Sequence, residues 1–385
     1  MYRSDDRILT SHVGSLPRPE RIMRLMFKQQ EGEQLADGET TEVRDAVIDA
    51  VRRQREAGVD IVNDGELGKV GFVNYACDRL EGLGPAEVTW SFFDLEEVPA
   101  VAERQYQSEG AQHINIPAVV GPLRYVGQEA AARDIATLKE GLAETGSEMA
   151  FMTAASPGIL TWHMPNQHYP SYQDYVMAMA DVMSEEYRMI ADAGFVLQLD
   201  CPDIPCGNPK HVRFWATDII NEMGYPQFVE LQLAALDRAT KDIPPEQLRL
   251  HLCWGNYEGP HHFDVPLADV LRPVLKARPK TISFEAANPR HEHEWMALKT
   301  LKVPEDHVII PGVINSVTNF VEHPEVVAQR LERFASVVDR DQIIAGTDCG
   351  FGTYVGFGDV AGAAVWRKLA SLSEGAALAS KRLWS

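Results

Sequence analysis

The stretch Leu250-His251-Leu252-Cys253-Trp254-Gly255-Asn256 predicts a strand that runs out into a Gly-Asn turn. Side chains two positions apart on a strand leave from the same face, so we expect the His251 imidazole and the Cys253 thiol to lie side by side. Imidazole nitrogen and thiolate sulfur are ligands that Zn²⁺ prefers. The pair therefore predicts a metal site at the end of this strand.

Two later strand-like segments also end in a metal-binding group. The segment Thr281–Glu285 ends in a carboxylate, and the segment Ile343–Cys349 ends in a second thiol. An isolated cysteine is usually a small buried apolar residue, which is the alternative for each thiol taken alone. Together the donors predict Zn²⁺ bound by His251, Cys253 and Cys349, with Glu285 as a fourth ligand or a nearby base.

Strand-like and helical segments alternate along most of the chain. Eight strands are predicted, beginning near residues 8, 59, 148, 195, 250, 281, 307 and 343. Helical spacing of apolar residues predicts helices near residues 40–57, 129–143, 172–193, 226–240, 266–277 and 324–338. This alternation predicts an α/β fold, a closed (β/α)8 TIM barrel, formed by a single catalytic domain over residues 1–385.

The segment from about residue 86 to 125 interrupts the alternation. Val88–Phe93 and His113–Val120 resemble strands, and no helical pattern is evident between them. They predict a β-hairpin inserted after the second strand of the barrel.

Several polar residues follow the predicted strands, where barrel enzymes place their active sites. Ser15, Glu66 and Asp200 each stand at such an end. A carboxylate there can bind an ammonium group, and the alternative is a solvated loop acid or a helix N-cap. Arg18 and Lys69 adjoin these motifs and could pair with an anionic substrate group, or could be ordinary surface cations.

The remaining candidate ligands have simpler interpretations. Cys201 and Cys206 flank a proline-rich turn and are expected to be structural, as is Cys77 in the core. The pair His261-His262 is expected to lie in a loop without a metal.

Composition restricts the class of partner. The 385 residues carry a formal net charge of -20, which argues against nucleic acid and anionic membrane surfaces. No apolar run is long enough to cross a membrane, and the N-terminus lacks the apolar core of a signal peptide. The five cysteines form no disulfide pattern. We therefore expect a cytoplasmic protein with small-molecule partners, and a homo-oligomer is compatible with the sequence.

These motifs resemble the catalytic barrel of cobalamin-independent methionine synthase and its short single-barrel relatives. The resemblance extends over nearly the whole chain and rests on residues 12–17, 64–66, 198–200, 251–253, 284–285 and 347–350. It implies Zn²⁺ bound by His251, Cys253, Glu285 and Cys349. It also implies a homocysteine acceptor bound by Ser15 near its carboxylate and by Glu66 and Asp200 near its ammonium.

The family reaction transfers a methyl group from a polyglutamylated methyltetrahydrofolate to a zinc-bound homocysteine thiolate. This sequence departs from the family pattern in three places. The predicted elements make up one barrel, whereas methionine synthase has two. The sequence is Asp200-Cys201-Pro202 where the family has Asp-Glu-Pro. It also lacks the histidine that the family places shortly after Pro311-Gly312-Val313.

The resemblance favours a zinc-dependent thiol alkyltransferase that takes a small thiol and an alkyl or methyl donor. A first alternative is the related transferase that opens an epoxide with the thiol of coenzyme M. Arg18 and Lys69 would then face a sulfonate, which Glu66 and Asp200 would repel. Two further alternatives are a metal-free lyase similar to uroporphyrinogen decarboxylase and a non-catalytic protein that binds zinc or thiols.

Overall fold

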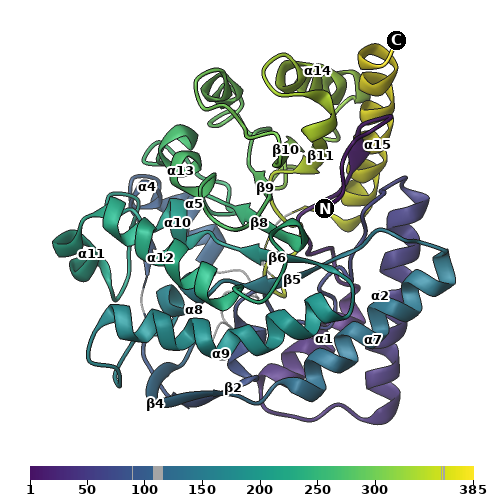
Figure 1. Ribbon diagram of the computed structural model, residues 1–385. Helices are drawn as coiled ribbons and strands as arrows, with labels where there is room; N and C mark the ends of the chain where they lie inside the picture. Colours follow the sequence, from purple (N-terminus) through teal and green to yellow (C-terminus); the bar gives the residue numbers. More distant parts are fainter. Residues whose placement is uncertain (89, 107–115, 357, 359) are drawn as a thin grey trace.

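A curled parallel sheet forms the centre of the protein, with helices around it (Figure 1). The computed structural model describes residues 1–88, 90–106, 116–356, 358 and 360–385. Seven parallel strands follow one another in the order β1-β11-β10-β9-β8-β6-β5. They are β1 (Leu9–Thr10), β5 (Phe151–Ala155), β6 (Val196–Asp200), β8 (Leu248–Leu252), β9 (Thr281–Phe284), β10 (Val308–Ile314) and β11 (Ile344–Thr347).

One of the eight predicted strands, the one expected to begin near residue 59, is only a short bridge between the two edges of this sheet. The Ile61 N–H donates to the Thr10 carbonyl at 3.0 Å, and Val62 pairs with Ala150 next to β5. The chain then turns, because the side chains of Asn63 and Asp64 accept the backbone N–H groups of the two residues that follow. Those side-chain bonds replace the ladder that the predicted strand would have needed.

The helices predicted from apolar spacing are confirmed, with ends displaced by a few residues. They are α2 (Asp37–Glu56), α7 (Gln128–Thr145), α9 (Tyr172–Asp192), α12 (Tyr225–Ala239), α13 (Leu267–Val274) and α14 (Pro324–Ala335). Gly58 and Gly194 follow α2 and α9 with φ values of 84° and 95°. This left-handed conformation favours glycine, and it lets each helix end immediately before the strand that follows.

Other helical segments were not predicted. The longer ones are α1 (Glu20–Gln30), α8 (Pro157–His163), α11 (Thr217–Met223) and α15 (Gly362–Leu383), and the single turns are α3 (Asn74–Cys77), α10 (Asp203–Cys206), η1 (Pro245–Gln247), η2 (Glu294–Lys299) and η3 (Arg340–Gln342). The start of α8 explains one such error. Proline and glycine, as at Pro157 and Gly158, are typical of loops, but the Ser156 hydroxyl caps the helix at the Ile159 N–H and proline is well suited to the first helical position.

The predicted hairpin is wrong in its pairing. The antiparallel pair is β2 (Leu80–Gly84) with β4 (Ala118–Tyr125), whereas β3 (Ser91–Phe92) pairs with β7 (Val212–Arg213). Two helices follow β3, namely α4 (Phe93–Glu96) and α5 (Pro99–Tyr106). Residues 89 and 113–115 of the predicted strands lie outside the described residues. The apolar runs were short, and such runs do not distinguish strand from helix.

A buried carboxylate connects the β2–β4 pair to α9. Glu186 accepts hydrogen bonds from the Tyr75 and Tyr125 hydroxyls at 2.9 and 2.6 Å and from the Arg79 guanidinium at 3.0 Å. Burial opposes ionisation, but the positive charges of Arg79 and Lys69 and the hydrogen bonds from the two tyrosines together outweigh it and lower the pKa of Glu186. The carboxylate is therefore charged, and its counter-ion is part of the core.

Among the described residues, no helix combines the length and the apolar character needed to span a membrane.

Replacing Arg79 with methionine tests this connection. We expect Arg79→Met to lower the free energy of unfolding by about 3 kcal/mol, because it leaves a buried carboxylate without its cation. Urea denaturation measures the change. The matched control is Arg188→Met on the exposed side of α9, with an expected change below about 0.5 kcal/mol. Equal effects of the two substitutions would contradict the assignment.

Candidate functional site

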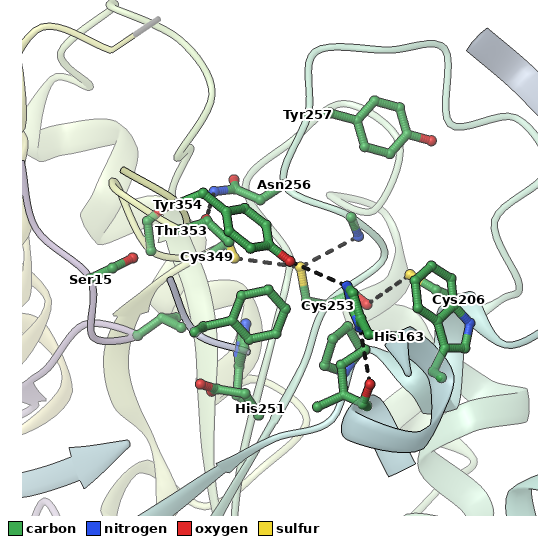
Figure 2. A pocket seen from close by; sticks show the side chains of 18 of the residues that line it. Ser15, His163, Cys206, His251, Cys253, Asn256, Tyr257, Cys349, Thr353 and Tyr354 are labelled. Carbon is green, nitrogen blue, oxygen red and sulfur yellow. Dashed lines mark hydrogen bonds between the residues drawn. The ribbon is translucent and has the colours of Figure 1, made fainter. Parts of the chain in front are cut away.

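A cavity opens at the carboxyl ends of the parallel strands (Figure 2). Residues from three predicted groups line it: the metal ligands, the small polar loop after β1 and the acidic strand ends. They include Ser15, Glu66, Asp200, His251, Cys253 and Cys349. The cavity is the place where the predicted site residues meet.

His251, Cys253 and Cys349 form the centre of the cavity floor (Figure 2). Their ligand atoms all lie within 4.8 Å of one another, and the two sulfur atoms are 3.4 Å apart. His251 lies within β8, Cys253 follows that strand directly, and Cys349 follows β11. The imidazole of His251 and the thiol of Cys253, two residues apart at the end of β8, therefore lie close together as predicted.

The donor set fits a metal ion. His251 is buried, and its Nε2 atom has no hydrogen-bond partner while Nδ1 lies 3.3 Å from the Ser283 hydroxyl. Burial lowers the pKa of His251 to about 3, so the imidazole is neutral at neutral pH, as a ligand must be. A buried acceptor nitrogen without a partner is costly, and a metal ion between it and the two sulfurs would remove that cost.

Glu285 lies next to this group without belonging to it. Its Oε1 accepts the Trp254 backbone N–H at 2.8 Å, and its Oε2 accepts the Asn288 side-chain amide at 2.7 Å. Burial is the largest cause of its raised pKa, followed by the nearby Cys253. The three close ligand atoms do not include this carboxylate, and its role as a fourth ligand remains a prediction.

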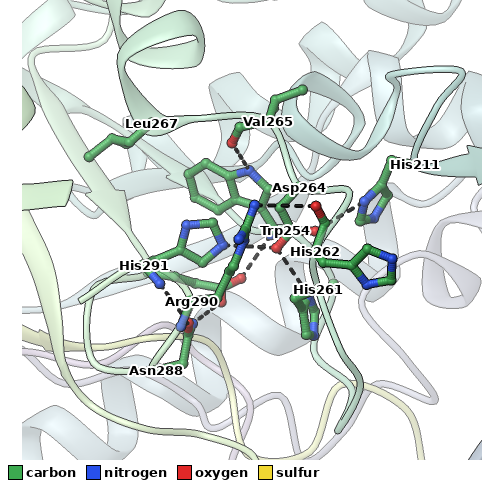
Figure 3. Close-up of polar contacts among 12 residues, drawn as sticks. His211, Trp254, His261, His262, Asp264, Val265, Leu267, Asn288, Arg290 and His291 are labelled. Carbon is green, nitrogen blue, oxygen red and sulfur yellow. Dashed lines mark hydrogen bonds and ion pairs between the residues drawn. The ribbon is translucent and has the colours of Figure 1, made fainter. Parts of the chain in front are cut away.

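Behind Cys253, a network of histidines surrounds Asp264 (Figure 3). His291 approaches the Asp264 carboxylate through Nε2 at 2.9 Å and Glu294 through Nδ1 at 2.7 Å. Its ring packs on Trp254 with the centroids 4.4 Å apart, and the Trp254 indole donates to the Val265 carbonyl at 2.8 Å. The network holds the residue next to Cys253 in one orientation.

Charge stabilises this network. Burial opposes the charged form of His291, but its bonds to Asp264 and Glu294 raise the pKa to about 10. The Asp264 pKa is lowered in turn, since its contacts with His211, His261 and His291 outweigh the effect of burial. His261 lies in a loop, as expected, and its side chain contributes to this buried network.

Ser15, Glu66 and Asp200 form the polar side of the cavity. The Ser15 hydroxyl accepts the Gly352 N–H at 3.2 Å, which joins the loop after β1 to the loop after β11. Glu66 Oε1 accepts the Thr153 hydroxyl at 3.0 Å, and the buried Oε2 has no partner. Burial raises the pKa of both carboxyl groups, and the charge of Glu66 raises that of Asp200 further. Two such acids favour a bound cation, which would let both ionise.

The backbone around Glu66 is strained. Glu66 has a φ of 55°, a left-handed value uncommon for residues other than glycine. A Cβ atom at Gly14, whose φ is 146°, would lie 2.5 Å from the Glu66 carboxylate. The loop after β1 therefore needs glycine for the carboxylate to reach the cavity.

Arg18 does not reach the cavity, contrary to the prediction. Its guanidinium donates to the backbone carbonyls of Gly352, Glu66 and Lys69 at 2.6 to 2.8 Å. The Lys69 ammonium likewise donates to the Thr153 carbonyl at 2.8 Å. Both cations serve to hold loops in place, so neither is positioned to pair with a substrate anion.

The sequence analysis missed the other side of the cavity, which is aromatic. Its rings come mostly from loops and short helices, and they are Phe72, Trp90, Phe92, Trp162, His163, Tyr257 and Tyr354. Cys206 also lines the cavity, where its thiol donates to the Cys253 carbonyl at 3.4 Å, in agreement with the expected structural role. The available signal was the position of Trp162-His163 and Tyr354 shortly after predicted strand ends.

The fold and the cavity define an α/β protein with an imidazole–dithiol group that could hold a metal ion at the carboxyl ends of parallel strands. The chain belongs to the family described as cobalamin-independent synthase, catalytic domain, whose profile matches residues 8–357. It is 24% identical over 345 residues to a methionine synthase of Thermococcus kodakarensis, a match that covers 89% of this chain and 86% of that protein. A methionine synthase of Pyrococcus furiosus is 25% identical over 346 residues, with coverages of 89% and 85%.

Solved structures share this fold. The B12-independent methionine synthase from Shewanella sp. W3-18-1, in complex with selenomethionine, superposes with a TM-score of 0.72 and 22% identity, covering 98% of this chain and 99% of the other. A putative vitamin-B12 independent methionine synthase from Listeria monocytogenes gives a TM-score of 0.64 at 19% identity, with coverages of 98% and 99%.

The Asp264 network leads to a prediction about pH. We expect His291→Leu to lower the free energy of unfolding near neutral pH by about 3 kcal/mol, because Asp264 and Glu294 lose a buried cation. A raised pKa in the folded state stabilises the protein fully below 6.5, and this contribution disappears as pH rises toward about 10. The difference between wild type and variant should therefore narrow over that interval.

Denaturation at about pH 6, 8 and 10 measures the difference. The control is His262→Leu, since His262 is 39% exposed and pairs with an exposed Glu97 at 3.2 Å. That substitution should change stability by less than about 0.5 kcal/mol. A gap for His291→Leu that stays constant with pH would refute the charged-network assignment.

Proposed function

We propose that this protein is a zinc-dependent methyltransferase that methylates homocysteine or a closely similar small thiol. The observation that carries the proposal is the meeting of the His251/Cys253/Cys349 group with the Glu66–Asp200 pair in one cavity. The first group suits a metal ion and a thiol, and the second suits an ammonium group. Family membership and the names of the relatives support the same activity.

The metal would be held by His251, Cys253 and Cys349, with Glu285 as the fourth ligand or as a base beside the site. Zinc suits this set because it accepts mixed sulfur and nitrogen ligands in tetrahedral geometry. When bound, zinc lowers the pKa of a thiol and so makes a nucleophile available at neutral pH.

The residues of the chain orient the acceptor. Glu66 and Asp200 bind its ammonium, and Ser15 lies where its carboxylate would be placed. The acceptor sulfur then attacks the methyl carbon in line, the S–CH₃ bond forms, and the bond from carbon to the leaving atom breaks with its electron pair on that atom. The aromatic side of the cavity excludes water from this step.

We further infer that the sheet is a closed (β/α)8 barrel and that residues 1–385 act as one catalytic domain. The bonds from residues 61 and 62 to both edge strands support closure. The alternative of coenzyme M as the thiol is not favoured, because Arg18 and Lys69 are bonded to backbone carbonyls and two carboxylates face the cavity.

Metal analysis tests the zinc assignment. We expect about one zinc per chain in the purified protein and a large loss of zinc in Cys253→Ser and in Cys349→Ser. Cys77→Ser is the matched control, since Cys77 is a partly buried thiol outside the cavity lining, and it should retain the metal. Wild-type activity that survives complete removal of zinc by a chelator would disprove the assignment.

Calorimetry tests the acceptor site. We expect Glu66→Gln and Asp200→Asn each to weaken homocysteine binding by about ten- to a hundredfold, because each removes a buried charge-assisted contact. Since the pKa values of both carboxyl groups are raised, wild-type affinity should increase as pH rises and they ionise. Zinc content should not change, and the exposed Glu230→Gln serves as the control. Unchanged affinity in both cavity variants would rule out the ammonium site.

A further inference from the structure

The aromatic side of the cavity is a continuous wall of rings. Successive pairs of centroids lie 5.4, 6.1, 4.7, 6.4, 5.4 and 4.5 Å apart. In this order the rings are Tyr354, Phe72, His163, Trp162, Trp90, Phe92 and Tyr257. We call this set the aromatic wall. The rings come from five separate parts of the chain, and all of them line the same cavity as the metal ligands.

The described residues that line the cavity include no lysine or arginine, and their carboxyl groups are those of Glu66 and Asp200. Glu66 is 3% exposed, and its Oε2 atom has no hydrogen-bond partner. Carboxylates beside aromatic faces attract cations, because the quadrupole of each ring presents negative potential.

The histidine and the two tyrosines of the aromatic wall are already engaged within the protein. The Nδ1 atom of His163 lies 3.0 Å from the Ile159 carbonyl, and Nε2 lies 3.2 Å from the Tyr354 hydroxyl. The Tyr257 hydroxyl donates to the Asp94 carboxylate at 2.9 Å. Burial lowers the pKa of His163 to about 4, so this imidazole carries no extra proton at neutral pH. The wall is therefore suited to binding and poorly suited to protonating a leaving group.

We infer that the methyl donor is an onium compound, a sulfonium or quaternary ammonium ion, bound against the aromatic wall. This inference rests on the proposed methyl transfer to a thiol and specifies the class of its second substrate. The acceptor sulfur gives its electron pair to the methyl carbon, and the C–S⁺ or C–N⁺ bond breaks with its pair on the leaving atom. The donor leaves as a neutral thioether or tertiary amine, so no proton is required.

This chemistry fits a cavity whose aromatic wall attracts cations and whose imidazole and tyrosine hydroxyls, among the described residues, are already hydrogen-bonded. A neutral tertiary amine that carries the methyl group is a poor donor unless its nitrogen is protonated, and general acids typically contribute about 10² to 10⁴ in rate. An onium donor has the required positive charge before it binds. Transfer also disperses that charge, so a cavity without water favours the step.

A donor comparison tests the inference. The zinc-loaded full-length protein is incubated with homocysteine and a deuteromethyl-labelled donor: S-methylmethionine, trimethylsulfonium, tetramethylammonium, or methyltetrahydrofolate with one or three glutamates. We expect labelled methionine from at least one onium probe, at a rate at least about a hundredfold above that with either folate, because folate needs an acid. Faster transfer from a folate, or no transfer from any onium probe, overturns the inference.

A spectroscopic measurement separates this inference from the function on which it rests. Homocysteine is added to the cobalt-substituted protein, and the sulfur-to-cobalt charge-transfer absorption is followed. If the absorption appears but no onium probe is consumed, the donor assignment fails and the thiol site stands. If homocysteine produces no absorption, the proposed function fails and the donor assignment fails with it.

Variants of Tyr354 test the wall itself. Tyr354→Leu removes one ring, and we expect it to raise the KM for the active onium probe by about tenfold through the lost cation–π contact. Tyr354→Phe keeps the ring and should raise KM less. Homocysteine titration of both variants shows whether the acceptor site is intact. An equal and large loss of turnover in Tyr354→Phe and Tyr354→Leu would show that the hydroxyl acts as an acid and the ring does not matter, and would overturn the inference.

Discussion

The register of the parallel strands is the constraint on which the site depends. Asp200 on β6 lies opposite His251 on β8, and Leu252 lies opposite Phe284, the residue before Glu285. Because parallel strands end at the same edge, this register brings an acid, an imidazole, a thiol and a second acid to one level. A shift of one residue would turn each of these side chains to the other face of its strand.

Much of the fold follows from local patterns. The long helices α2, α7 and α9 were predictable because their apolar spacing persists over several turns and a glycine follows two of them. The short bridge at Val62 was not predictable, because the sequence around it resembles a strand. The side chains of Asn63 and Asp64 instead accept backbone N–H groups and turn the chain. The pairing of β2 with β4 depends on contacts between distant segments, which periodicity does not encode.

The polar half of the site was predictable and the aromatic half was not. His251, Cys253 and Cys349 carry chemistry that is rare at strand ends, so three residues were sufficient to indicate a metal. Aromatic residues occur throughout any core, and only their positions shortly after predicted strand ends distinguish Trp162 and Tyr354 from core rings before the fold brings them together. Arg18 was predicted incorrectly because backbone carbonyls satisfy a buried guanidinium as well as a substrate anion does.

The pairing of β1 with β11 has a consequence for how the protein is made. Leu9 lies opposite Ile344. The hydrogen bonds between β1 and β11 therefore form only after β11 has been synthesised. Contacts between residues so far apart in sequence form slowly, because closing a long loop costs entropy before the contact repays it. Cys349 leaves the ribosome within the same late segment, after His251 and Cys253 have been exposed for about a hundred residues of synthesis. Assembly of the three donor residues is thus coupled to the pairing of β1 with β11, a late stage of folding.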